Sequence, residues 1–213
     1  MFCKPYDEKD GMKVWLEEHE VQLFLSAATS SKQELAFGLG VRSGLRAEEI
    51  TNVRPKDIIT TSAGPRVRVQ SGKGDKYRET PTTAEIYHTA RSAVEFGGHS
   101  DAKPLVDKST RTLRRWVGRV ANDLADRTGD DNWRFLGPHD LRRTWATSLA
   151  ARIDDPLLVC EWGGWDDLET FLDHYRGSYS PEMQRRAIEQ VEWLDGETTA
   201  SDRDPETVLL ESE

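Results

Sequence analysis

The chain has 213 residues, of which 36% are hydrophobic and 31% are charged, and its formal net charge is −9. No stretch reaches the roughly 18–20 apolar residues of a membrane span, and the first residues lack the apolar core of a secretory signal. Two cysteines, Cys3 and Cys160, are too few for a disulfide framework or a four-ligand zinc site. These features argue against membrane-embedded and disulfide-stapled classes and favour a cytoplasmic protein with reduced thiols.

The charge is unevenly distributed along the chain. Residues 191–213 hold eight acidic residues and one arginine, whereas residues 111–143 hold eight arginines and five acidic residues. The overall charge therefore argues only weakly against a nucleic-acid ligand. Arginine outnumbers lysine 20 to 9. Many acids with few lysines suit a cytoplasm at high salt, which suggests a haloarchaeon, or a virus or plasmid of one, as the source.

The first third of the chain is predicted to be helical. Apolar residues near helical spacing predict a helix over 14–28. A second helix is expected over 31–44, with Ser31 as its N-cap and Gly44 as its end. A third, short helix follows and ends near Pro55, because proline disfavours helical backbone in the residue before it.

The pattern then changes to short β-type runs and returns to helices. The runs at 57–60, 66–70 and 77–81 predict a small three-stranded antiparallel sheet, with a tight turn at 72–75. Helices are expected again over 82–96, 109–127, 139–152, 156–162 and 181–194. The fold class predicted from this order is α+β and mainly α-helical, with one small sheet.

The domain organisation expected from these patterns is simple. Residues 1–16 form an N-terminal stub, and residues 17–194 form one domain. Residues 195–213 are polar, acidic and aperiodic, which predicts a disordered tail or a docking peptide.

The stretch GPHDLRRTWATSLA, residues 137–150, carries a candidate phosphate site. His139 and Arg142 lie three residues apart and so share one face of the predicted helix. The Pro–His entry puts them near the helix start, where backbone N–H groups favour an anion. The alternative is a capping histidine beside a surface arginine.

Two further stretches carry charged candidates. In SGLRAEEITNVRP, Arg46 opens a helix and Glu49 lies three residues on, where it can hold that arginine. The alternative is a solvated ion pair worth under about 1 kcal/mol. In SGKGDKYRETP, Lys73 lies in a glycine-flanked turn between strands. That turn can carry the lysine into a neighbouring groove, or it can simply be a soluble turn.

The order of these stretches is more specific than any one of them. The chain presents GLRAEEI, then GKGDKYRETP, HDLRRTWAT, GGW and a tyrosine. This order resembles the catalytic domain of the tyrosine recombinase (phage integrase) family, over about residues 17–192. The resemblance implies site-specific DNA recombination, as integration, excision or resolution, through a 3′-phosphotyrosyl intermediate. No cofactor and no metal are expected.

The resemblance also implies roles for individual residues. Arg46 and Arg142 match the two arginines that grip the non-bridging oxygens of the scissile phosphate. Lys73 matches the hairpin lysine that protonates the leaving 5′-oxygen. His139 matches the histidine of the H-x-x-R box, and Glu49 matches an acidic position that supports the first arginine.

Two tyrosines compete for the role of nucleophile. Trp165 matches a position that the family fills with histidine or tryptophan, and Tyr175 and Tyr179 lie ten and fourteen residues after it. Most relatives place the nucleophile one residue closer than Tyr175, a difference that a turn absorbs easily. Apolar residues at helical spacing over 168–175 would bring Tyr175 against the core and the arginines. Tyr175 is therefore the expected nucleophile, and Tyr179 is the alternative.

The expected partner is double-stranded DNA, bound by a homo-oligomer, a tetramer, that is weakly associated or monomeric without DNA. Family members usually carry a further N-terminal domain that clamps DNA, so we expect a short member, a truncation or an excised domain, with weak DNA binding alone. The helix predicted over 181–194 would dock on a neighbouring protomer or pack onto its own domain. The alternative function is a non-catalytic DNA-binding or regulatory relative of the same fold.

Overall fold

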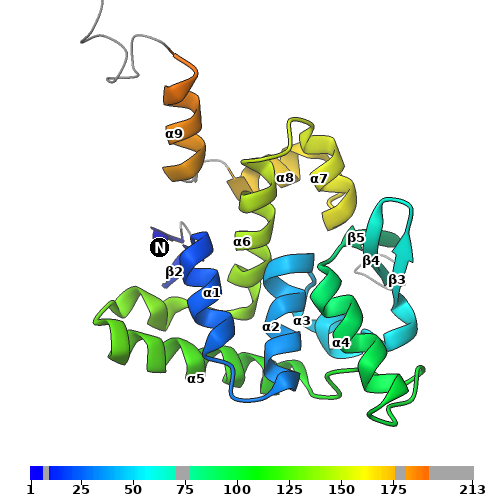
Figure 1. Cartoon of the computed structure of the whole chain (residues 1–213). Helices are drawn as coiled ribbons and strands as arrows, with labels where there is room; N and C mark the ends of the chain where they lie inside the picture. The colour runs from blue at the N-terminus through cyan, green and yellow to red at the C-terminus, as the bar shows by residue number, and fades with distance from the viewer. Residues whose placement is uncertain (7–9, 71–76, 176–180, 192–213) are drawn as a thin grey trace, which may run out of the picture. The chain divides into compact units, whose positions relative to one another are not determined.

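The computed structural model describes residues 1–6, 10–70, 77–175 and 181–191. The chain divides into one compact unit, Met1–Ser178, and a second unit, Tyr179–Glu213. In the second unit the structure describes helix α9 (Pro181–Glu189), which confirms the start of the helix predicted over 181–194; the described helix ends at Glu189, and residues 192–194 lie outside the described part of the chain. The first unit contains the elements that carry the candidate site (Figure 1).

Local capping signals set the ends of the early helices, α1 (Glu18–Ser26), α2 (Ser31–Ser43) and α3 (Ala47–Asn52). Helix α2 is capped by Ser30, whose side chain accepts from the backbone N–H of Gln33, so the prediction of Ser31 as N-cap was one residue late. Gly44 ends α2 in the left-handed region at φ 64°, as predicted. A Cβ on Gly44 would also lie 2.2 Å from the Trp145 ring, so both backbone conformation and packing require glycine there.

The helix predicted over 14–28 was wrong in its first residues. Strands β1 (Phe2–Pro5) and β2 (Met12–Trp15) form an antiparallel hairpin, and α1 begins only at Glu18. The backbone N–H groups of Val14 and Leu16 donate to the side chains of Asp140 (3.2 Å) and Thr144 (3.1 Å). These bonds to a helix far along the chain hold the segment extended, and Val14, Trp15 and Leu16 are buried.

The three-stranded antiparallel sheet was predicted and is confirmed. Its order is β3 (Ile58–Thr61), β4 (Gly64–Val69) and β5 (Arg78–Pro81), with Val69 paired to Arg78. The inner face of the sheet carries the buried side chains of Ile58, Val67 and Val69. On β4 the two valines lie on either side of an exposed residue, as the two-residue period of a strand requires. The turn between β4 and β5, which carries Lys73, lies outside the described residues.

The remaining helices of the first unit are also confirmed. They are α4 (Ala84–Glu95), α5 (Thr110–Thr128), α6 (Pro138–Ala150), α7 (Pro156–Gly163) and α8 (Leu168–Tyr175). Short 3-10 turns, η1 (Pro55–Asp57) and η2 (Asp131–Phe135), follow α3 and α5. Within the described part of the chain, no helix is both long and apolar enough to cross a membrane.

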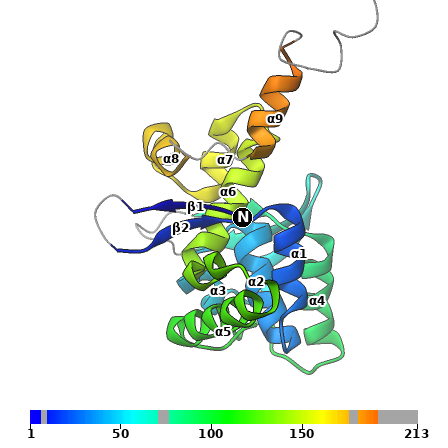
Figure 2. The same ribbon diagram turned by 90° about the vertical axis from the view of Figure 1, so that its left-hand side faces the viewer.

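Helix α6 joins the two apolar clusters of the first unit. Leu141 belongs to the larger cluster, which gathers residues of α1–α5 and the sheet. One turn later, Trp145 and Ala146 belong to the smaller cluster, together with Val159, Cys160 and Phe171 from α7 and α8. Figure 2 shows α6 running between the lower helices and the α7–α8 pair. Arg142, which follows Leu141 on α6, therefore lies where the two clusters meet.

Candidate active site

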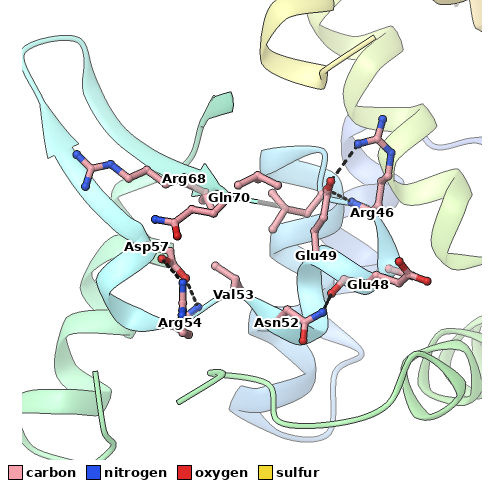
Figure 3. A pocket seen from close by; sticks show the side chains of 13 residues that line it. Arg46, Glu48, Glu49, Asn52, Val53, Arg54, Asp57, Arg68 and Gln70 are labelled. Atoms are coloured by element: carbon pink, nitrogen blue, oxygen red, sulfur yellow. Dashed lines mark hydrogen bonds and ion pairs between the residues drawn. The ribbon is translucent and has the colours of Figure 1, made fainter. Parts of the chain in front are cut away.

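The first candidate arginine, Arg46, is held at the start of α3. Its backbone N–H donates to Glu49 Oε2 (2.6 Å), and its Nη1 donates to Glu49 Oε1 (3.0 Å) (Figure 3). This is the support that the i, i+3 spacing predicts. The Arg46 side chain is 34% exposed, whereas the Glu49 side chain is 5% exposed. The carboxylate is thus a buried support, and the guanidinium reaches toward solvent.

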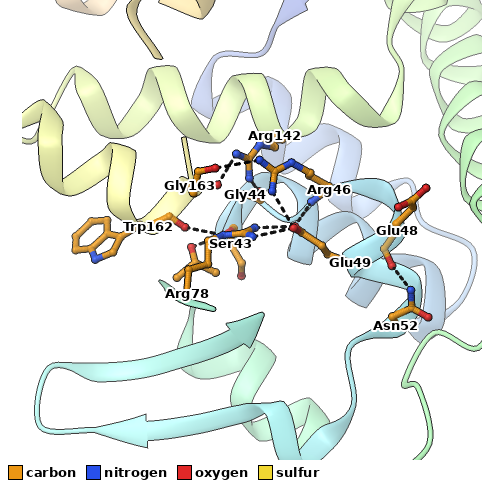
Figure 4. A network of polar contacts seen from close by, with 12 residues as sticks. Ser43, Gly44, Arg46, Glu48, Glu49, Asn52, Arg78, Arg142, Trp162 and Gly163 are labelled. Atoms are coloured by element: carbon orange, nitrogen blue, oxygen red, sulfur yellow. Dashed lines mark hydrogen bonds and ion pairs between the residues drawn. The ribbon is translucent and has the colours of Figure 1, made fainter. Parts of the chain in front are cut away.

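A second arginine, Arg78, shares the same carboxylate and was not among the predicted site residues. Its Nη1 and Nη2 donate to the two oxygens of Glu49 at 2.8 and 2.6 Å, and its Nε donates to the carbonyl of Trp162 at 3.1 Å (Figure 4). Only 5% of its side chain is exposed. Period-two alternation on β5, where Arg78 and Thr80 are both buried, would have marked it as facing inward.

These contacts keep Glu49 ionised. Burial by itself raises the pKa of the Glu49 carboxyl, but the hydrogen bonds and charge of Arg78, together with those of Arg46, outweigh it and lower the pKa to about 2. At neutral pH one carboxylate therefore faces two guanidinium groups. The cluster keeps a positive excess, which suits an anionic ligand.

Helix α6 brings His139 and Arg142 to the same place. Pro138 occupies the first turn after the N-cap Gly137, as the Pro–His entry predicts. Arg142 is buried, and it donates to the carbonyls of Gly44 (2.5 Å) and Gly163 (2.6 Å). His139 is exposed and lines a cleft of about 530 Å³ together with Arg46 and Arg142. The two predicted arginines and the histidine, from α3 and α6, thus converge on one cleft.

Other cationic and aromatic side chains complete the cleft wall. Arg114 of α5 and Arg134 of η2 line it, and so does Tyr6 of the N-terminal hairpin. Figure 3 shows a second cleft, on the sheet side of Arg46, which Arg54 and Arg68 also line. Across the described ranges, no three His, Cys, Asp or Glu side chains gather in a way that would hold a metal ion.

Trp165 lies against Arg142. Its ring centre is 4.3 Å from the Arg142 guanidinium carbon, and the ring packs edge-on against Phe171 at 5.0 Å. A Cβ on Gly163 would lie 1.7 Å from the Trp165 ring. The glycine of the GGW motif is therefore what allows Trp165 to lie over Arg142.

For the expected nucleophile, Tyr175, the structure describes only the backbone. Tyr175 is the last residue of α8, one turn after Phe171, which is 1% exposed and packs against Trp165. The side chain of Tyr175 lies outside the described part of the structure, as do Tyr179 and Lys73. Their roles remain predictions.

Comparison with known proteins shows the family to which the chain belongs. The family model described as Phage integrase family matches residues 14–181. The chain belongs to this family. It is 28% identical over 171 residues to tyrosine recombinase XerH of Campylobacter jejuni and 29% identical over 175 residues to tyrosine recombinase XerA of Saccharolobus solfataricus, which covers 75% and 79% of this chain. The matches cover 48% and 56% of those relatives, so the chain spans about half their length.

Solved structures of the family share the fold. The crystal structure of XerA recombinase superposes with a TM-score of 0.65 at 24% identity, covering 83% of this chain and 64% of that one. A post-cleavage complex of XerH bound to its palindromic difH substrate gives 0.61 at 22% identity, covering 85% and 53%. The catalytic domain of bacteriophage HP1 integrase gives 0.56 at 15% identity, covering 83% and 94%. These likenesses confirm the predicted fold.

Proposed function

We propose that the chain is the catalytic part of a tyrosine-type site-specific recombinase, which cuts and rejoins double-stranded DNA. The observation that carries the proposal is the convergence of Arg46, His139 and Arg142 on one cleft, with Trp165 packed between Arg142 and Phe171 of α8. Family membership and the relatives named tyrosine recombinase support it. DNA as the partner is supported by the difH complex of the related XerH.

The reaction places each group in a defined role. The Tyr175 oxygen attacks the scissile phosphorus in line, so that a P–O(tyrosine) bond forms as the P–O5′ bond breaks. Tyrosine has a pKa near 10 in water, and nearby cations ease its ionisation. Arg46 and Arg142, with the His139 imidazole and the Trp165 indole N–H, stabilise the charge that develops on the phosphate oxygens. The tyrosine proton is released, and the leaving 5′-oxygen takes a proton from Lys73.

The phosphotyrosine link conserves the energy of the broken ester, so rejoining is the same step in reverse. The 5′-hydroxyl of the partner strand gives its proton to Lys73 and attacks the phosphorus, the P–O(tyrosine) bond breaks, and the tyrosine oxygen takes up a proton. Strand exchange between two duplexes requires several protomers at one junction, and we extend the proposal to a homotetramer on DNA. The helix over Pro181–Glu189 would dock on a neighbouring protomer in that assembly.

Covalent trapping on DNA tests the function. The chain is incubated with a pool of duplexes that carry a nick beside a randomised core, so that cleavage releases a short strand and leaves the protein attached. We expect a covalent adduct that resists denaturant, and peptide mapping that places the phosphate on Tyr175. Tyr175→Phe should form no adduct, and Tyr179→Phe is the matched control that should. DNA binding without an adduct would instead favour the non-catalytic alternative.

The role of Lys73 has its own test. If Lys73 protonates the leaving oxygen, Lys73→Ala should cleave normal DNA slowly and cleave a 5′-bridging phosphorothiolate at the wild-type rate, because sulfur leaves without a proton. Lys76→Ala, three residues further along the chain, is the matched control. Equal defects of Lys73→Ala on both substrates would assign Lys73 to phosphate binding.

A further inference from the structure

The C-terminal end of α7 holds three arginines through three consecutive carbonyl groups. Trp162 O accepts from Arg78 Nε (3.1 Å), Gly163 O from Arg142 Nη2 (2.6 Å) and Gly164 O from Arg46 Nη2 (3.2 Å). The last carbonyls of a helix have no partner within the helix and carry the negative end of its dipole. The C-terminal end of α7 is therefore a favourable binding position for cationic side chains (Figure 4).

Two of these three arginines line the cleft, and the third does not. Arg46 and Arg142 are among the cleft residues, whereas Arg78 lies behind them with 5% of its side chain exposed. Gly164 leaves the space that Arg78 needs, because a Cβ there would lie 2.8 Å from Arg78 Cδ. Arg78 is thus packed between α3 and α7, and its own backbone lies in β5.

Arg78 also fixes the orientation of the carboxylate that supports Arg46. Each oxygen of Glu49 accepts one bond from Arg46 and one from Arg78. The planar, two-pronged contact of Arg78 holds the carboxylate plane more firmly than a single bond would. Without it, Glu49 could rotate about its last torsion, and the side chain of the partly exposed Arg46 would keep only the bond to the Gly164 carbonyl as a fixed support.

We propose that Arg78 is a positioning residue, which holds Glu49 and the C-terminal end of α7 at a fixed spacing so that Arg46 and Arg142 are aligned on the same phosphate. The role rests on the proposed function, since it concerns the two arginines of that site. Arg78 itself does not touch the DNA. It links β5, which follows the turn that carries Lys73, to the segment that leads into α8.

The test compares three variants on the nicked DNA described above. Arg78→Met removes the charge and keeps most of the side-chain volume, and Arg78→Lys keeps the charge but loses the two-pronged contact. Arg42→Met is the matched control. Arg42 donates to Glu18 through Nη1 and Nη2, and this pair does not line the cleft. Single-turnover adduct formation is measured at saturating DNA, with DNA affinity and folded fraction measured alongside.

We expect Arg78→Met to slow adduct formation by about 100-fold, the order of loss that follows misplacement of a catalytic group, while DNA affinity changes little. Arg78→Lys should recover part of the rate, and Arg42→Met should cleave at the wild-type rate. A rate for folded Arg78→Met equal to that of wild type would overturn the proposal. So would a loss that appears only in DNA affinity.

The pH profile separates positioning from a merely structural role. The charged groups that face Glu49 are Arg78 from β5 and Arg46 from the start of α3. In Arg78→Met the carboxyl keeps its burial and loses its stronger partner, so its pKa rises. The variant should therefore lose further activity as pH falls from 7 to 5, a range over which Glu49 stays ionised in the wild type. Parallel profiles would count against the role.

A readout without DNA keeps this inference separate from the proposed function. If wild type forms no adduct, the proposed function fails, and Arg78 is judged by the side-chain N–H signals of Arg46 in nitrogen-labelled protein. We expect one sharp Arg46 signal in wild type and in Arg42→Met, and a shifted or broadened signal in Arg78→Met. An unchanged Arg46 signal in Arg78→Met would overturn the positioning role.

Discussion

Two helix starts in this molecule use the same local device with different results. At the start of α3, Glu49 is the third helical residue and accepts the backbone N–H of the N-cap Arg46. At the start of α6, Asp140 is the third helical residue and accepts the backbone N–H of the N-cap Gly137 (2.9 Å). Each carboxylate also binds a buried arginine, Arg78 in the first case and Arg143 in the second.

The difference lies in whether a further arginine of the cluster stays partly exposed. The Asp140–Arg143 pair is closed over by the N-terminal hairpin, where Tyr6 and Trp15 face the Arg143 guanidinium, and its side chains are only 6% and 7% exposed. In the Glu49 cluster, Glu49 and Arg78 are equally buried, but the Arg46 side chain is 34% exposed and lines a cleft. One device therefore anchors the hairpin, and the other places a partly exposed guanidinium group in a cleft.

The largest expected effect is the loss of folding stability when the Asp140–Arg143 pair is broken. Asp140→Ala should lower the free energy of unfolding by about 3–5 kcal/mol, because it leaves Arg143 as an unpaired buried charge and also removes the acceptor of the Val14 N–H. Denaturant unfolding measures this. Asp123→Ala breaks an exposed pair with Arg127 and is the control, with an expected loss under about 1 kcal/mol. Equal losses in the two variants would erase the distinction between anchor and surface pair.

In the Glu49 cluster, we expect the loss of the partly exposed arginine to slow cleavage and to leave the free energy of unfolding nearly unchanged. Arg46→Ala should reduce adduct formation by about 100- to 1,000-fold, since it removes a preorganised donor to the transition state, and should leave the unfolding midpoint nearly unchanged. Single-turnover cleavage and circular dichroism measure the two properties. Arg54→Ala, a partly exposed arginine on the neighbouring cleft, is the control. Near-normal cleavage by a folded Arg46→Ala would refute its role.

Acid titration sharpens the comparison through Glu49. Its folded pKa of about 2 lies below the ordinary value of 4.5, so its ionised form contributes stability that is present above about 4.5. That contribution is lost as pH falls toward 2, and it amounts to at most about 3 kcal/mol. Glu49→Gln should flatten this part of the curve of unfolding free energy against pH. An unchanged slope between pH 4.5 and 2 would show that Glu49 is not the group responsible.

The smallest expected effect is at the surface of α2. Arg42→Ala breaks a two-bond contact with Glu18, whose side chain is half exposed, and should cost no more than about 1 kcal/mol. Because the Glu18 pKa is lowered chiefly by the hydrogen bond of Arg42, this cost should disappear as acid protonates Glu18. Lys32→Ala on the same helix is the control. A loss near that of Asp140→Ala would contradict the ranking by exposure.

Local signals predicted most of the elements, because the groups that decide them lie close together in the chain. Gly44 ends α2 through its own backbone conformation, and period-two alternation places the three strands. The Arg46–Glu49 contact was predictable for the same reason, since residues three apart meet at a helix start. The motif order further predicted His139 and Arg142 as partners of Arg46, and the three line one cleft.

Partners distant in sequence decided the rest. Val14 and Leu16 are extended because their N–H groups bond to side chains 126 and 128 residues away, so helical spacing misled over that segment. Arg78 meets Glu49 across 29 residues and Trp162 across 84. By itself the sequence determined which charges and helix ends exist. Only the tertiary structure decided which cation each carboxylate and each free carbonyl binds, because a buried polar group takes whichever partner packing brings within reach.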